Sequence, residues 1–120
     1  MACFYKALLY YHAGDYLTAK EILEPLIIDY QSYEYMPELI SCFNLMGVIA
    51  YCEGEYILTR YFFKRGLKIA ENHKEKSRYS YEYNNIALTY IAQQDYVKAL
   101  GYILMADQYL GDSDEKMGAY

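Results

Sequence analysis

Proline is almost missing from the sequence, with two residues among 120. β-Sandwiches and barrels consist of many short strands, and their sequences carry turn residues at short regular intervals. Leu, Ile, Ala and Tyr dominate here instead, and 55% of the residues are hydrophobic. This composition favours helices that can bury a core, and the length limits the chain to one domain.

Basic residues are also few, and they are scattered along the chain. The sequence has 11 Lys and Arg against 16 Asp and Glu, which gives a net charge of −5. Because nucleic-acid binding relies on a basic face, we expect no nucleic-acid partner. No run of about eighteen apolar residues predicts a membrane span, and residues 1–4 do not resemble the start of a signal peptide. We therefore expect a cytoplasmic protein.

Residues that support catalysis or metal binding are scarce. The two histidines, His12 and His73, lie far apart, and the sequence has no zinc-protease, nucleophile-elbow or phosphate-loop motif. The three cysteines form no CxxC pair, and Cys42 and Cys52 should lie about 15 Å apart along one helix, too far for a disulfide. We expect reduced, buried thiols, no metal, no cofactor and no enzymatic activity within these residues.

An internal repeat is the main feature that the sequence does contain. The stretches 4–16, 44–56 and 84–96 begin forty residues apart, and each is an apolar segment that ends at Gly or Gln, an acidic residue and a tyrosine. Repetition at periods of about 20–50 residues is typical of solenoids. It predicts three antiparallel helix pairs, with helices at 1–13, 16–30, 37–52, 55–71, 77–93 and 96–110.

The residues at the predicted turns support these boundaries. Gly14 adopts a left-handed turn without steric cost, and Asp15 can cap the helix that follows. Gln94 stands where this glycine is expected, and because a left-handed glutamine costs about 1–2 kcal/mol we expect a different turn there. Pro25 predicts a bend or an irregular turn over residues 21–25 of the second helix.

Side-chain size is kept at equivalent positions of the three periods. Small residues on facing sides let paired helices approach closely, and a tyrosine at the start of each second helix can wedge its ring between the pair. The small positions are Ala7, Gly47 and Ala87, and Ala19, Thr59 and Ala99; the tyrosines are Tyr16, Tyr56 and Tyr96.

This pattern resembles the tetratricopeptide repeat (TPR). The likeness is carried by Ala7, Gly14-Asp15-Tyr16 and Ala19 and by the equivalent residues of the next two periods. The usual period of that family is about 34 residues, and the longer one here looks like that of arrays in bacterial signalling proteins. The resemblance implies an all-α, right-handed superhelical solenoid of repeats 1–35, 36–75 and 76–114, with 115–120 starting a truncated fourth repeat.

The resemblance also implies a concave groove, lined by the first helix of each pair, that binds a protein or an extended peptide. The candidate groove residues are Tyr11, His12, Ser41, Asn44, Val48, Tyr51, Tyr81, Asn84, Asn85 and Leu88. Asn44 and Asn84 are equivalent, and their amides could grip a peptide backbone or, alternatively, bond only to neighbouring helices. No position that matches the family's basic clamp is Lys or Arg, so we expect no C-terminal carboxylate ligand.

Two functional hypotheses follow from the sequence. The first is a non-catalytic protein- or peptide-binding scaffold, a regulatory or sensor segment of a larger bacterial signalling protein. The alternative is a self-association module, a homo-oligomer formed through uncapped repeat ends, that dimerises an attached cyclase, kinase or DNA-binding domain. Substitutions in the groove should affect the first function, and substitutions at the ends of the array the second.

Overall fold

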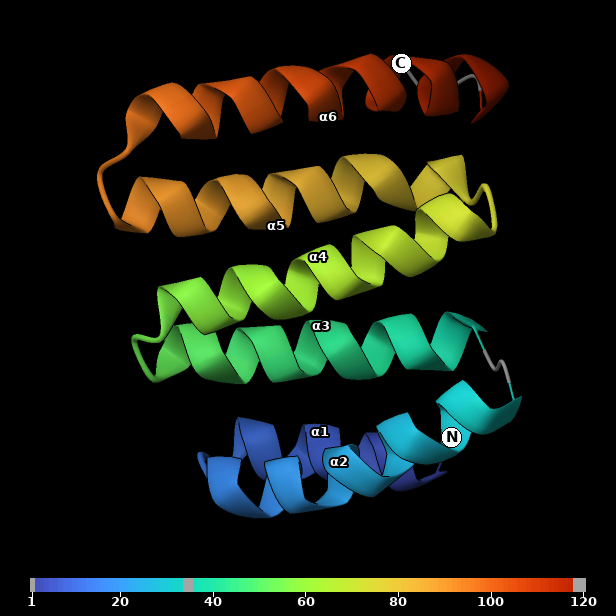
Figure 1. The fold of residues 1–120 in the computed structure, drawn as a ribbon, viewed down its shortest axis with the longest axis vertical. Helices are drawn as coiled ribbons and strands as arrows, with labels where there is room; N and C mark the ends of the chain where they lie inside the picture. Colours follow the sequence, from blue (N-terminus) through green and yellow to red (C-terminus); the bar gives the residue numbers. More distant parts are fainter. Residues whose placement is uncertain (1, 34–35, 118–120) are drawn as a thin grey trace.

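The computed structural model describes residues 2–33 and 36–117, and this part of the chain is helical throughout apart from its turns. The helices are α1 (Ala2–His12), α2 (Tyr16–Tyr33), α3 (Met36–Cys52), α4 (Tyr56–Asn72), α5 (Tyr79–Ala92) and α6 (Tyr96–Met117), with a 3₁₀ turn η1 (Lys76–Arg78) before α5. They pack as consecutive antiparallel pairs that follow one another along the long axis (Figure 1). The predicted all-α fold of three helix pairs is confirmed.

Several helix ends differ from the prediction. α2 is continuous through Pro25 and ends at Tyr33, so of the two predicted alternatives, a bend or an irregular turn, the irregular turn does not form. Leu23, which is fully buried, and Leu26 hold this part of α2 in the core and offset the hydrogen bond that the proline removes. Residues 77–78 belong to η1 and not to α5.

The C-terminal end of α6 also lies beyond its predicted position. The helix runs past residue 110 to Met117, and no proline interrupts this segment. Residues 115–117 therefore extend α6 and do not open a new helix. The rest of the predicted fourth repeat, residues 118–120, lies outside the described residues.

Four helices end in the same left-handed turn. The residues with positive φ are Gly14 (84°), Gly54 (79°), Lys74 (56°) and Gln94 (62°). At Gln94 the amide of Asp95 donates to the carbonyl of Tyr90 and the amide of Gln94 to that of Ile91, both at 2.9 Å. Corresponding pairs of bonds form at the other three turns, and together they make the Schellman arrangement. The expectation of a different turn at Gln94 is wrong, because these two bonds offset the cost of its φ.

The positions predicted to be small are buried between the helices. Ala7, Ala19, Thr59, Ala87 and Ala99 are each at most 2% exposed. Buried Thr59 satisfies its hydroxyl by donating to the carbonyl of Glu55 at 2.9 Å. A Cβ atom on Gly47 would lie 2.6 Å from the Phe63 ring, so this glycine permits the close contact of α3 with α4.

The tyrosines that begin the second helices do not all behave as predicted. The Tyr16 ring stacks on Tyr11 at 5.9 Å, and the Tyr56 ring lies 5.3 Å from Tyr51, so each packs between the helices of its pair. Tyr96 is 62% exposed, and the prediction of a wedged ring is wrong for it.

Contacts between neighbouring pairs recur at the sequence period. The Lys20 ammonium on α2 donates to both carboxylate oxygens of Glu53, at 3.2 Å each. Forty residues later, the Arg60 guanidinium on α4 donates to Gln93 Oε1 at 2.6 Å and to buried Thr89 at 3.1 Å. Each second helix therefore holds the end of the next first helix through one cationic side chain.

Candidate functional site

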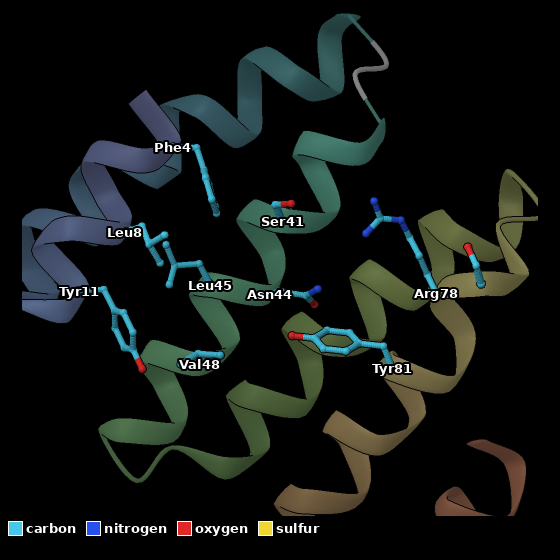
Figure 2. A pocket seen from close by; sticks show the side chains of 10 residues that line it. Phe4, Leu8, Tyr11, Ser41, Asn44, Leu45, Val48, Arg78 and Tyr81 are labelled. Atoms are coloured by element: carbon cyan, nitrogen blue, oxygen red, sulfur yellow. The ribbon is translucent and has the colours of Figure 1, made fainter. Parts of the chain in front are cut away.

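A cavity of about 620 Å³ opens between the first helices of the three pairs (Figure 2). It is lined by Phe4, Leu8 and Tyr11 of α1, by Ser41, Asn44, Leu45 and Val48 of α3, by Ser77 and Arg78 of η1, and by Tyr81 of α5. We call this cavity the inner groove. Its volume falls within the range of ligand sites, and its walls combine apolar side chains with hydroxyl, amide and guanidinium groups.

Arg78 gives the inner groove a positive charge that the sequence analysis missed. Figure 2 shows its guanidinium directed from the start of α5 toward Ser41 on α3. Among the residues that line the groove it is the one charged side chain. The sequence analysis considered only the positions that match the family's basic clamp, and Arg78 is not one of them. Arg78 was missed because it lies in a 3₁₀ turn just before α5, outside the helical positions that the resemblance places in the groove.

The structure distributes the predicted groove residues over two cavities and the surface. Tyr11, Ser41, Asn44, Val48 and Tyr81 line the inner groove. A smaller cavity of about 170 Å³ beside it is lined by Val48, Tyr51, Phe63, Asn85 and Leu88. Neither cavity is lined by His12 or Asn84, which are both exposed. The His12 ring lies against Tyr11 at 4.9 Å.

A second cavity of similar volume, about 600 Å³, lies on the side of α4, α5 and α6. Its walls are mainly apolar and aromatic, and it is lined by Lys64, Leu67, Tyr83, Ile86, Tyr90, Lys98, Gly101, Tyr102 and Met105. None of the predicted groove residues lines it. The sequence analysis placed the site on the opposite, first-helix face.

Asn44 reaches behind the inner groove to a buried acid. Its Nδ2 donates to Oε2 of Glu82 on α5 at 2.9 Å, and Glu82 is 0% exposed. Asn44 Oδ1 and Glu82 Oε1 are buried without a hydrogen-bond partner among the described residues. Of the two roles considered for Asn44, the contact with a neighbouring helix is therefore formed. The sequence analysis did not single out Glu82.

Burial controls the ionisation of Glu82. Loss of hydration raises the pKa of its carboxyl from 4.5 to about 7, while the bond from Asn44 and the charge of Arg78 oppose this rise. Tyr11 also shows a raised pKa, caused by burial and then by its contact with Cys52, whose sulfur lies 4.0 Å from the tyrosine oxygen. The raised pKa of Glu82 means that the charge of this carboxyl can change near neutral pH.

The cysteines are free, but two of them are not buried as expected. Cys3 and Cys52 are exposed, and Cys42 is buried in the apolar cluster that α1, α2 and α3 share. Burial raises the pKa of the Cys42 thiol to about 12, so it stays protonated and acts as an apolar side chain.

Searches for other kinds of site in the described part of the chain gave negative results. Within residues 2–33 and 36–117, no three His, Cys, Asp or Glu side chains gather where they could hold a metal ion. No helix in the same ranges is long and apolar enough to cross a membrane. No protein-family model, curated protein or solved structure matches the chain.

Proposed function

We propose that the chain is a non-catalytic, TPR-like binding module whose inner groove holds an extended peptide. The observation that carries the proposal is the groove itself, which is formed by α1, α3 and the start of α5, the first helix of each pair. A cavity of about 620 Å³ with separate polar groups suits a few residues of peptide. In the wider proposal, the module is a regulatory or sensor segment of a larger bacterial signalling protein.

The chemistry of the groove walls supports a peptide more than a compact ligand. Tyr11 and Tyr81 offer broad aromatic surfaces that lose little side-chain entropy on binding. Arg78 can donate to carbonyl groups along a backbone. The Ser41 hydroxyl donates to the carbonyl of Pro37 at 3.1 Å, so its oxygen can accept from a backbone amide. The groups come from three helices, so an extended segment could contact all of them at once.

Tyr81→Ala tests the groove. Tyr81 is 58% exposed and lines the cavity, so its removal should weaken peptide binding about tenfold or more without unfolding the chain, as expected for an aromatic contact. Peptides would first be selected from a phage library of random sequences and then measured as synthetic peptides by fluorescence anisotropy. Tyr96→Ala is the matched control, because Tyr96 is 62% exposed and does not line the groove. Equal binding by both variants would contradict the proposal.

A specific observation favours self-association as a second candidate function. On α6, Val97, Leu100 and Leu104 are 84%, 57% and 59% exposed. Their spacing of three and four residues places them on one side of the helix. Such an apolar stripe resembles half of a helix–helix interface, and it would bring attached output domains together.

Leu100→Glu combined with Leu104→Glu tests this alternative. If the stripe joins two copies, the double variant should sediment as a monomer at concentrations at which the wild type sediments as a dimer, because two carboxylates would be buried in the interface. Ile57→Glu is the control, since Ile57 is an apolar α4 residue that is 75% exposed away from the stripe. A wild type that remains monomeric at every concentration would reject self-association and leave peptide binding unaffected.

A further inference from the structure

Within the described residues, two buried oxygen atoms where α3 meets α5 lack a hydrogen-bond donor. Asn44 and Glu82 are already joined by the bond from Nδ2 to Oε2 at 2.9 Å. The remaining oxygens, Asn44 Oδ1 and Glu82 Oε1, are buried and unpaired in the described structure. An amide oxygen and a carboxylate oxygen can only accept hydrogen bonds, so these two atoms cannot satisfy each other while Glu82 is ionised.

A single proton on Glu82 would give both unpaired oxygens a hydrogen-bond partner. A protonated carboxyl has an O–H donor. Both unpaired oxygens face the same point on α4, because a Cβ atom at Gly66 would lie close to each of them. We propose that Glu82 and Asn44 form a proton-binding site, in which neutral Glu82 donates from Oε1 to Asn44 Oδ1 and closes a ring of two hydrogen bonds between α3 and α5. No other group is altered: the proton comes from water and returns to water.

Gly66 on α4 makes room for this pair. A Cβ atom at Gly66 would lie 3.3 Å from Asn44 Oδ1 and 3.5 Å from Glu82 Oε1, the two unpaired atoms. The backbone of α4 therefore covers the pair closely from the second-helix side. Because both oxygens are buried, a ligand in the inner groove cannot supply the missing donor. Glu82 itself is the group in reach that can do so.

The groups that face the Glu82 carboxyl come from α3, α4 and the turn before α5. Asn44 faces it from α3, Gly66 from α4, and Arg78 from the turn that precedes α5. Within the described residues, Arg78 is the charged group that acts on the carboxyl, and it favours the ionised form. Burial outweighs this attraction and raises the pKa of Glu82 to about 7.

We call the contact between one helix pair and the next a junction: the first joins α1 and α2 to α3, and the second joins α3 and α4 to α5. The first junction shows that the polar pair is not needed for packing. Asn44, Gly66 and Glu82 correspond, forty residues before, to Phe4, Leu26 and Cys42. Buried Cys42 belongs to an apolar cluster against which Phe4 and Leu26 pack. The first junction thus closes with apolar side chains at all three positions. At the second junction an ionisable pair stands in their place, so α3 and α5 separate more easily when the proton leaves.

Glu82→Gln provides the test, because a glutamine amide can form the same two bonds with Asn44 without titrating. A raised folded-state pKa means that the contribution of Glu82 to stability is full below about pH 4.5 and is lost as pH rises through about 7. The wild-type folding equilibrium should therefore weaken by about two orders of magnitude from about pH 5 to about pH 9, measured by urea unfolding. The Glu82→Gln variant should lack this fall and exceed the wild type at the alkaline end.

The control variant is Glu24→Gln, which changes an exposed glutamate on α2 and should keep the wild-type pH profile. A wild type that gains stability as pH rises, with Glu82→Gln weaker throughout, would overturn the proposal and indicate an ionised Glu82 held by Arg78. A carbon-13 NMR titration of the Glu82 carboxyl in the wild type gives the answer even if the variant fails to fold. A midpoint near that of free glutamate would also overturn it. Neither urea unfolding nor the NMR titration needs a ligand. The proposal of a proton-binding site is therefore tested independently of the proposed peptide binding.

Discussion

Asn44→Ala should destabilise the protein by about 2 kcal/mol in acid and by about 4 kcal/mol above the pKa of Glu82, whereas Asn84→Ala should change stability by less than about 0.5 kcal/mol. The two asparagines occupy equivalent positions, yet only Asn44 bonds to a buried acid. Its removal takes away the donor that bonds to Glu82, whose side chain is fully buried. The loss grows with pH because the ionised carboxyl is then a buried charge without this hydrogen-bond donor, which costs more than a buried neutral carboxyl.

Urea unfolding of the two single variants at acidic and alkaline pH measures this difference. Asn84 serves as the matched control, since it is exposed and has the same side chain in the same register. Equal effects of the two substitutions would show that the bond to Glu82 adds nothing to stability. The result also decides how the inner groove can be probed: a variant of Asn44 would lose binding through partial unfolding, so Tyr81 is the better choice.

Gly47→Ala should destabilise the protein by about 2 kcal/mol, although alanine is the better helix former by about 1 kcal/mol. The new Cβ atom would lie 2.6 Å and 2.8 Å from two carbons of the Phe63 ring. Phe63 is 4% exposed and belongs to the core, so its ring cannot simply move aside. The clash therefore outweighs the gain in helix propensity, and the change can be followed by urea or thermal unfolding.

Gly101→Ala is the matched control for Gly47→Ala. Gly101 lies within α6, and nothing lies within 4 Å of the position of its Cβ, so the same substitution should stabilise by about 1 kcal/mol. Adding Phe63→Leu to Gly47→Ala should recover part of the loss, because the flexible leucine can yield where the ring cannot. If both glycine variants gained stability, the close approach of α3 and α4 would be refuted.

The helical architecture could be predicted because each period carries several independent signals that agree. The turn residues at 14, 54 and 94, the small residues at the helix contacts and the apolar helix faces all specify the same pairs. The burial of Ala7, Gly47 and Ala87 could be predicted because small residues recur at this position in all three periods. Turn residues, small residues and apolar faces are local features of the sequence, so they can be recognised without knowledge of the neighbouring helices.

The polar interior of the second junction could not be predicted in the same way. Glu82 lies in a tyrosine-rich segment, and a glutamate is normally placed on the surface. Its burial depends on Asn44, 38 residues away, and on the space left by Gly66 of a third helix. Superposing the periods even misleads here, because it equates Asn44 with Asn84 although only one of them has a buried partner.

The turn at Gln94 and the end of α6 were missed for a different reason. The left-handed Lys74 and Gln94 conflict with the preference for glycine, and the sequence cannot show that two backbone hydrogen bonds offset the cost. In α6 the glycine at position 111 is a plausible stop, yet the helix continues to Met117. A glycine marks a helix end only where the chain that follows turns back, and tertiary contacts decide that.

The recurring left-handed turn bears on how quickly the chain can fold. Each such turn reverses the chain within a few residues, so a helix meets its next neighbour across a short loop and closing that loop costs little entropy. The main helix contacts join consecutive helices, which gives the fold a low contact order. Folding can therefore start at any helix pair and spread to the next, and the barrier depends on one local step and not on a search for distant partners.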